Sequence, residues 1–458
     1  TGNIKNNYKI TSRLDVELNL SGNYREQLNP GTLSRRDNSV TGEYDRDFDI
    51  NPFSYAMNTS RALTAYDANG NLEYFTSNYA PFNILNELEN NNLRLRIMDV
   101  KLQAAVNYKL TKDLSYSFTG AIRYMKSDRE HMIEGNSNMA MAYRADYNST
   151  IRSGNKFLYQ DPENPNSEKV SVLPAGGFYN RVENLLKSYD IRNQLNYKGK
   201  IGELHDLSVI GGMQITGNDR QNFSNTGYGY QYDMGGVPYI DYRIVKMMLE
   251  SNFDYYDMTE DRYRFVAFYA NAEYTYDMRY AFSATFRDEG SNQMGKKSSA
   301  RWLPTWNVGF RWNIMEESFM EPFSKVVDHM NIRTSYGLSA SPPRVARNPT
   351  TIYYNQNAYR PQGSSEQEST IYISRVGDEG LTWEKSYQFN VGFNISMFKN
   401  KFDLMVEYWG KDNYDLIDRI KTSGFSGEMN RYANYSDLKS HGWEFTLGIV
   451  PIQTKDLS

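Results

Sequence analysis

Apolar and polar residues alternate along extended stretches of the chain, and this period of two constrains the fold more than any other feature. Every second residue from Leu14 to Tyr24 is apolar or glycine, and the residues between them are Asp, Glu, Asn or Ser. The ranges 114–124, 280–287, 389–397 and 443–449 follow the same pattern. Because successive side chains of a strand point to opposite faces, each stretch predicts a β-strand with one apolar and one polar face.

The length of these stretches favours a membrane setting. A strand that crosses a bilayer needs about 9–11 tilted residues, whereas an ordinary strand has about 5–6. Aromatic residues also gather near the predicted strand ends, as they do in the girdles of membrane barrels. These residues are Tyr108, Tyr124, Tyr274, Tyr280, Tyr408 and Trp409. A soluble β-sandwich shows the same alternation, so alternation alone leaves both folds open.

The connections between the stretches separate the two folds. We predict strands at 3–10, 14–24, 94–109, 114–125, 187–199, 205–217, 262–275, 279–288, 302–312, 331–338, 385–397, 401–411 and 438–450. Short connections (11–13, 110–113, 200–204, 276–278 and 398–400) alternate with long ones (25–93, 126–186, 218–261, 339–384 and 412–437), and 289–301 and 313–330 are intermediate. Such alternation puts the tight turns at one end and the long loops at the other, which a Greek-key sandwich has no reason to do.

The expected fold is therefore all-β: a transmembrane, antiparallel, up-and-down β-barrel. We expect Leu14, Val16, Phe118, Phe282, Phe393 and Phe445 to face lipid. Thirteen strands do not close such a barrel, because single-chain bacterial barrels have an even number. An open sheet would also leave unpaired backbone groups in lipid, where each costs several kcal/mol. We expect residues 1–458 to be part of one larger barrel domain.

Composition excludes several classes of function. The 51 basic and 55 acidic residues give a net charge of −4, which does not suit a nucleic-acid binder. Cys is absent, so disulfides and thiolate sites are excluded, and the four His are far apart in sequence. No catalytic set, metal site or cofactor motif stands out, so we expect no enzyme, no bound metal and no cofactor. No signal peptide is visible at the N-terminus either.

A glycine-rich segment, 224–240, holds the candidate substrate-binding residues. Tyr228, Tyr230, Tyr232 and Tyr239 fall in the predicted long connection 218–261. Tyrosine rings can stack on a ligand and still hydrogen-bond, although packing between loops or docking of a partner would explain the same residues.

Two further sets of residues allow a functional and a structural interpretation. The segment from Asp67 to Glu73 resembles the start of a calcium loop, but it lacks the Glu at position 12 and also fits a hairpin turn, which we favour. Arg344, Arg347 and Arg360 could bind carboxylates or a partner, or form a solvated rim.

Several blocks of sequence resemble the SusC/RagA family of TonB-linked outer-membrane proteins. The segment 272–291 resembles the family's barrel signature through Arg279-Tyr280, an alternating strand and Arg287-Asp288, with Glu289 inserted before Gly290. Further blocks at 51–56, 302–312, 316–320, 332–337 and 381–385 occur in the order typical of the family.

The resemblance implies a barrel of about 22 strands with a plugged lumen. It implies active import of nutrient oligomers, most often oligosaccharides and in the RagA branch peptides, across the outer membrane of a Bacteroidetes-like Gram-negative bacterium. It also implies two partners: a SusD/RagB-like surface lipoprotein, and a TonB complex that pulls on an N-terminal plug. The plug, the signal peptide and the final strands are then expected outside residues 1–458.

Three other functions remain as alternatives. A passive porin would have an open channel of about 16–18 strands. A barrel enzyme would need a paired acid and base at the outer rim. A surface adhesin is compatible with the long loops but not favoured by the family blocks.

Overall fold

The computed structural model describes residues 1–31, 36–37, 44–45, 48, 50–60, 62–250, 255–294, 301–341, 351–355, 370–375, 381–424 and 429–450. The strands that build the main sheet are β1 (Gly2–Lys9), β2 (Leu14–Pro30), β7 (Asn91–Lys109), β8 (Leu114–Ile133), β9 (Gly177–Ile201), β10 (His205–Gln231), β12 (Tyr256–Tyr276), β13 (Tyr280–Ser291), β14 (Trp302–Asn313), β15 (Val327–Ser341), β18 (Glu384–Met397), β19 (Phe402–Lys421) and β20 (Asn430–Ile449).

The remaining elements are short. Strand β11 (Val237–Pro238) pairs with the end of β10, and three small hairpins are β3 (Arg36–Asp37) with β4 (Tyr44–Asp45), β5 (Phe75–Ser77) with β6 (Ala80–Phe82), and β16 (Thr351–Asn355) with β17 (Thr370–Arg375). The helices are α1 (Pro52–Asn58), α2 (Ile84–Asn90), α3 (Asn138–Ala142), α4 (Ser149–Gly154) and α5 (Tyr242–Glu250), with 3-10 turns η1 (Tyr232–Met234), η2 (Ile314–Glu316) and η3 (Ser318–Phe323). Within these described parts, no helix is both long and apolar enough to cross a membrane.

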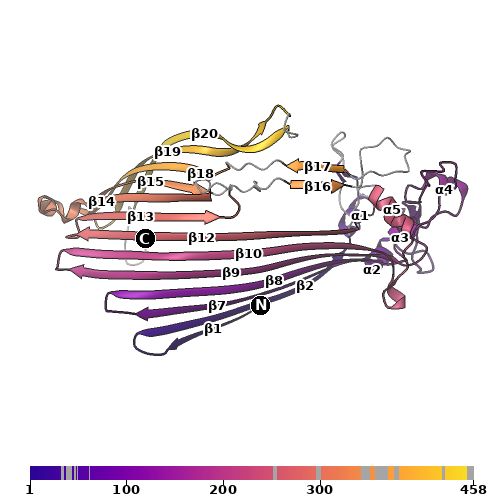
Figure 1. The fold of residues 1–458 in the computed structure, drawn as a ribbon, viewed down its shortest axis with the longest axis horizontal. Coiled ribbons are helices and arrows are strands. Elements are labelled where there is room, and N and C mark those ends of the chain that lie inside the picture. Colours follow the sequence, from indigo (N-terminus) through magenta and orange to yellow (C-terminus); the bar gives the residue numbers. More distant parts are fainter. Residues whose placement is uncertain are drawn as a thin grey trace.

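The main sheet is a single antiparallel meander. Its strands follow one another in sequence order from β1 to β20, each hydrogen-bonded to the next long strand (Figure 1). Each of the thirteen predicted strands corresponds to one of these thirteen, and no second sheet packs against them among the described residues. The expected up-and-down architecture is confirmed, as an open sheet with β1 and β20 at its two edges.

The short and long connections lie at opposite ends of the sheet, as predicted. The tight turns after β1, β7, β9, β12 and β18 share one end, and α1 to α5 gather at the other (Figure 1). The intermediate connection 314–326, with η2 and η3, belongs to the short-turn end, so it keeps the alternation that it was expected to break. The prediction of a long loop at 412–437 is wrong, because β19 and β20 extend until only 422–429 connect them.

The strands run further toward the helical end than the alternation predicts. Strand β9 has 25 residues and β10 has 27. Above the predicted boundaries both faces carry polar residues, so the period of two disappears although the backbone pairing continues. Cross-strand pairs such as Asp128 with Glu183 and Asn222 with Thr259 show the ladder beyond that point.

The strand register puts the six predicted lipid-facing residues on one face of the sheet, which we call the apolar face. Val16 pairs with Val106, which pairs with Phe118. Phe282 pairs with Phe310. On the far strands, Phe393 pairs with Val406, which pairs with Phe445. The opposite face, which we call the polar face, carries Asn, Ser, Thr and charged side chains.

Two tight turns have the same construction. In the first, Thr11 Oγ1 accepts hydrogen bonds from the backbone N–H groups of Arg13 and Leu14. In the turn after β7, Thr111 Oγ1 accepts from Asp113 and Leu114 in the same way. The similarity between these hairpins in sequence is therefore a shared side-chain cap.

Three of the resemblance blocks meet at the short-turn end of the sheet. Glu317 accepts hydrogen bonds from the hydroxyl of Tyr280 at 2.5 Å and from Trp312 Nε1 at 3.0 Å. Arg279 Nη1 lies 3.5 Å from Glu317 Oε2. These contacts lower the pKa of Glu317, the Tyr280 bond having the largest effect. The blocks therefore hold the connection 314–326 against the ends of β13 and β14.

Candidate functional site

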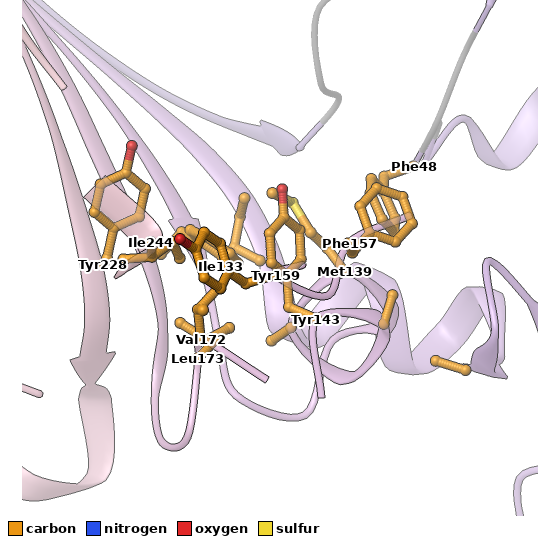
Figure 2. Packing of buried hydrophobic residues seen from close by; sticks show 14 residues of the cluster. Phe48, Ile133, Met139, Tyr143, Phe157, Tyr159, Val172, Leu173, Tyr228 and Ile244 are labelled. Atoms are coloured by element: carbon orange, nitrogen blue, oxygen red, sulfur yellow. The ribbon is translucent and has the colours of Figure 1, made fainter. Parts of the chain in front are cut away.

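The connections at the helical end fold into a cap, which comprises the described residues of 48–90, 134–176 and 232–250. Figure 2 shows its core, where buried side chains from separate connections pack together. Phe157 lies 5.2 Å from Phe48 and 5.1 Å from Tyr143 between ring centroids. Phe178, on β9, lies 5.1 Å from Tyr143. The cap thus has a hydrophobic core of its own.

The cap core is continuous with three strands of the sheet. Ile133 and Tyr228, at the ends of β8 and β10, are part of the same cluster (Figure 2). Phe178, at the start of β9, belongs to it as well. Ile244 adds α5 to it. Because strand ends and loops share one core, the sheet fixes the position of the cap.

A half-buried arginine, Arg144, joins the two ends of the connection 134–176. Arg144 Nε and Nη1 donate to the carbonyl oxygens of Leu173 and Gly135, each at 2.9 Å, and Nη2 donates to the carbonyl of Gly176. Burial lowers the pKa of Arg144. Gly176 has φ +69°, and a Cβ there would lie 2.6 Å from the carbonyl oxygen of Tyr230, so the close approach requires glycine.

A buried carboxyl joins α2 to α3. Glu87 is 1% exposed, and its Oε1 accepts from the backbone N–H of Asn138 at 2.7 Å and from Asn86 Nδ2 at 3.2 Å. Burial raises the pKa of Glu87 to about 7. Asn138 in turn donates through Nδ2 to the carbonyl oxygens of Ser77 and Ala80. This group ties three segments of the cap together.

The four candidate tyrosines lie close together but differ in access. Tyr228 is 5% exposed in the cap core, and Tyr230 stacks on Tyr179 at 5.1 Å. The hydroxyl of Tyr232 donates to the carbonyl of Phe178 at 2.7 Å. Tyr239 is 58% exposed, and its backbone N–H donates to the carbonyl of Gly229 at 2.8 Å.

The expectation that all four lie in a loop is wrong for Tyr228 and Tyr230, which belong to β10. Their glycine-rich segment pairs with the start of β9 through an irregularity between Tyr228 and Tyr230, where Gly229 adopts φ +66°. Ligand contact by these residues is a prediction, and only the Tyr239 ring is largely open to solvent.

The Asp67 segment is a turn. Asp67 Oδ1 accepts from the backbone N–H groups of Asn69 at 2.8 Å and Asn71 at 2.9 Å, and these bonds contribute to a lowered pKa of Asp67. Tyr66 pairs with Leu72 across it. The carboxylate is therefore occupied by backbone donors, as the hairpin interpretation predicts. Arg344, Arg347 and Arg360 lie outside the described residues.

The apolar face ends abruptly at charged residues on six neighbouring strands. The uncharged stretches on this face are 14–24, 98–108, 114–124, 189–199, 207–217 and 266–276, each spanning 11 positions. The next residues on that face toward the cap are Glu26, Arg96, Lys126, Lys187, Asp219 and Arg264. With about 3.4 Å per residue and a tilt of about 45°, such stretches cover about 25 Å, the height of the apolar band of an outer-membrane barrel.

This charge boundary crosses the sheet diagonally. On β8 the first charge is Lys126, but on β9 it is Lys187, the residue directly opposite Tyr124. On β12 it is Arg264, which lies opposite the uncharged Gly217 of β10. A boundary parallel to the membrane must run diagonally when the strands are tilted, so the pattern supports a tilted, membrane-spanning sheet.

Ion pairs cover the apolar-face side just beyond the boundary. Lys126 Nζ lies 3.1 Å from Glu183 Oε2, and Arg181 Nη2 lies 2.9 Å from Asp128 Oδ1. Nearby, Arg96 Nη2 lies 2.5 Å from Glu130 Oε1. The surface beyond the apolar stretches is thus suited to water and polar headgroups.

The polar face carries ordered rows of side chains across neighbouring strands. Arg123 binds Asp99 through Nε at 2.8 Å and Nη2 at 2.7 Å. On later strands, Arg333 Nη2 reaches Glu407 Oε2 at 2.6 Å. Arg333 passes over Gly392, where a Cβ would lie 2.7 Å from Arg333 Nε.

Two pockets open on the polar face. One, of about 370 Å³, is lined by residues of β13, β14, β15 and β18, including Arg287, Glu289 and Asn307. The other, of about 410 Å³, is lined by β8, β9, β10 and β12 and includes Arg220, Asn184 and Asp261. Sequence reasoning missed both, because their residues meet only through the strand register. In the parts that the structure describes, no group of three or more His, Asp or Glu is arranged to hold a metal ion.

Comparisons with known proteins agree with this architecture. The sequence model of the family described as "TonB dependent receptor-like, beta-barrel" matches residues 2–450. TonB-dependent receptor P39 of Formosa agariphila is 23% identical over 319 residues, which cover 67% of this chain and 28% of that protein. TonB-dependent receptor SusC of Bacteroides thetaiotaomicron is 24% identical over 199 residues, 42% of this chain and 19% of that protein. The matched part is thus less than a third of either relative's length.

A solved structure shares the fold along almost the whole chain. The structure of the RagAB peptide transporter superposes with a TM-score of 0.69 at 18% identity, covering 99% of this chain and 44% of that one. Its "closed-closed" state gives a TM-score of 0.68 at 17% identity.

Proposed function

This chain belongs to the TonB-dependent receptor-like β-barrel family, whose members are outer-membrane transporters and not enzymes, and we propose that it forms wall and outer surface of an active importer of nutrient oligomers. The observation that carries the proposal is the combination of a charge boundary on the apolar face with a folded cap above it. The boundary supports a membrane position for the sheet, and the cap puts an ordered surface where cargo arrives.

Energy for import has to come from elsewhere in the full-length protein. In this proposal a plug fills the lumen beside the polar face, and a TonB complex pulls on it. The wall described here then contributes a fixed cavity, because the paired strands and the shared core of the cap resist deformation. A cavity open at both ends could not support uptake against a gradient.

We propose oligosaccharides as the cargo and a SusD-like surface lipoprotein as the partner that closes over the cap. The cap offers a docking area, since α1 exposes Phe53 (75%) and Met57 (69%) and the segment before α5 exposes Tyr239. Phe53 and Met57 are four residues apart on α1 and so share one face of the helix, and apolar side chains grouped on an exposed surface are typical of interaction sites. Tyr239 is therefore the candidate tyrosine best suited to contact the cargo or the lipoprotein.

Uptake in cells tests the transport proposal. Cells that express the full-length protein should take up labelled oligosaccharide, and uptake should stop when TonB is deleted or the proton gradient is dissipated. Cargo binding to the purified complex should persist in both conditions. Uptake at the full rate without TonB would mean a passive pore and would contradict the proposal.

Peptide import is the second candidate. The fold likeness to a structure named as a peptide transporter favours it. A competition experiment separates the two, because unlabelled peptide mixtures should inhibit uptake only if peptides are the cargo. Replacing Tyr239 by Ala should weaken cargo or lipoprotein binding, with Tyr255→Ala, another exposed tyrosine nearby in sequence, as the matched control.

A further inference from the structure

The pocket between β8 and β12 lies on the polar face at the level of the charge boundary. Arg220, which lines it, follows Asp219, the first charged residue on the apolar face of β10. The volume of the pocket, about 410 Å³, falls within the range of about 300–1,000 Å³ that is common for ligand sites. The pocket is thus at the depth where cargo would leave the outer surface and enter the lumen.

Two cross-strand rows build the pocket. In the first row Met125 pairs with Leu186, Leu186 with Arg220, and Arg220 with Asp261. The second row, one step nearer the cap, holds only neutral hydrogen-bonding side chains. It consists of Ser127, Asn184, Asn222 and Thr259. One side of the pocket is therefore apolar, one side is charged, and hydroxyl and amide groups line the edge toward the cap.

Arg220 differs from other arginines on the polar face. Arg123 and Arg333 are each held by a carboxylate. Arg220 is exposed, and among the described residues its guanidinium has no hydrogen-bond or ion-pair partner. A guanidinium offers a planar pair of donors that matches a carboxylate. Asp261, the cross-strand neighbour of Arg220 in this pocket, has an interaction of its own, so the free donors of Arg220 define the charged group that the pocket suits.

Aromatic rings continue the pocket along β12. Tyr263 is two residues from Asp261, so it lies on the same face, and it is stacked with Phe265 at 6.3 Å and 14°. Arg287 lies over the Phe265 ring at 5.6 Å and also lines the second pocket. An aromatic ring on one side of the charged row, with hydroxyl and amide groups on the other, suits the alternating apolar and hydroxylated surfaces of a sugar chain.

We infer that this pocket is a cargo subsite for an acidic sugar unit, whose carboxylate binds the Arg220 guanidinium while its hydroxyls meet the Ser127, Asn184, Asn222 and Thr259 row. The inference rests on the proposed import function and deepens it, because it names uronic-acid oligosaccharides as the cargo class. Tyr263, two residues from Asp261 and held by Phe265, provides the aromatic contact for a neighbouring sugar unit.

Binding to the full-length transporter, purified in detergent, tests the subsite. The probes are the tetramers of galacturonate, glucuronate and mannuronate, and the fully methyl-esterified galacturonate tetramer, which keeps the shape and removes the charge. Calorimetry should show that Arg220→Gln weakens binding of an acidic tetramer about tenfold or more, as expected for loss of a charge-assisted contact, and leaves the ester unchanged. Arg220→Lys should restore part of the affinity.

Arg192→Gln is the matched control. Arg192 lies on the polar face of β9, is exposed, and has no ion-pair partner among the described residues, but it is not part of the pocket. This variant should bind the acidic tetramer as the unaltered protein does. Affinity for the acidic tetramer should also fall with added salt, whereas affinity for the ester should not.

Several outcomes would overturn the inference. It is wrong if none of the acidic tetramers binds, if Arg220→Gln affects acid and ester equally, or if a tetraglutamate peptide binds more tightly than every uronate. Lower thermal stability of Arg220→Gln with unchanged binding would mean that Arg220 holds another part of the protein. TonB-independent uptake with an intact Arg220 effect would contradict the transport proposal and leave the subsite standing.

Discussion

In the sheet, Phe268 and Phe286 are about half exposed on the apolar face, whereas in the cap Phe157 and Phe178 are almost completely buried. The sheet has no opposing layer among the described residues, and its backbone ladder pairs every strand to the next. The cap has short helices, irregular connections and a closed aromatic cluster. The two regions thus suit different solvents. Lipid can cover the apolar side chains of the sheet, whereas the cap, which is surrounded by water, buries its apolar side chains in a core.

We expect the largest effect from a substitution at the junction of the two regions, where the core of the cap meets β9. Phe178→Ala should destabilise the cap by about 3–5 kcal/mol, because a fully buried ring would leave a cavity among Tyr143, Tyr228 and their neighbours. Hydrogen exchange should rise in 134–176 and 232–250 while the sheet stays protected. Tyr239→Ala, at an exposed ring, is the control. Exchange that rises equally throughout the sheet would show that the cap does not unfold as a separate unit.

The next effect tests the lipid side. Phe118 lies near the middle of its apolar stretch, so Phe118→Arg should lower the free energy of unfolding by about 2–4 kcal/mol in lipid vesicles. Thr119→Arg, which places the same charge on the polar face of β8, should have a much smaller effect. Urea titration of the full-length protein measures both. Equal losses would contradict the assignment of the two faces.

A smaller effect depends on pH and concerns the cap alone. The pKa of Glu87 rises to about 7 on folding. Its contribution to the stability of the cap is therefore fully present below the unfolded pKa of about 4.5 and is lost as pH rises through 7. The loss amounts to about 3 kcal/mol at most. Glu87→Gln keeps a carbonyl acceptor for Asn138 and should remove this part of the pH dependence, as measured by protease resistance at pH 5 and pH 8. The idea fails if the variant is as pH-sensitive as the original protein.

The smallest effect is on the polar face of the sheet. Gly392→Ala puts a Cβ in the path of Arg333 and should displace it from Glu407. Since the ion pair between Arg333 and Glu407 is partly exposed, the expected loss in the free energy of unfolding is about 1 kcal/mol or less. Glu407→Gln should give a similar loss, and the double variant should add little. Clearly additive losses would mean that Gly392 has another role.

The sequence predicted the sheet well because lipid imposes a simple pattern. Alternation located every long strand, and the spacing of turns located the two ends. The upper parts of β8 and β9 were missed because polar residues on both faces, such as Asp128 and Asn184, carry no period. The prediction for Tyr228 failed because glycines that suggest a loop instead allow a bulged strand pair.

The cap could not be predicted in the same way. Phe48, Phe157 and Leu173 stand alone or in apolar runs of two or three residues within irregular segments, and nothing local indicates that they share a core. Arg144 and Glu87 look like ordinary surface charges in sequence, yet both are consumed by distant backbone groups. The Arg220 pocket depends on four strands in one register, which pairing reveals and spacing does not.

The diagonal boundary also fixes how far the molecule projects from the cell. Strand β9 continues for ten residues from Lys187 to Gly177, about 30 Å of paired strand along its axis. These paired strands hold the cap at a distance from the lipid headgroups. In the proposed importer, an antibody or a phage that approaches the bacterium would therefore meet a folded epitope wherever the lipoprotein leaves the cap uncovered.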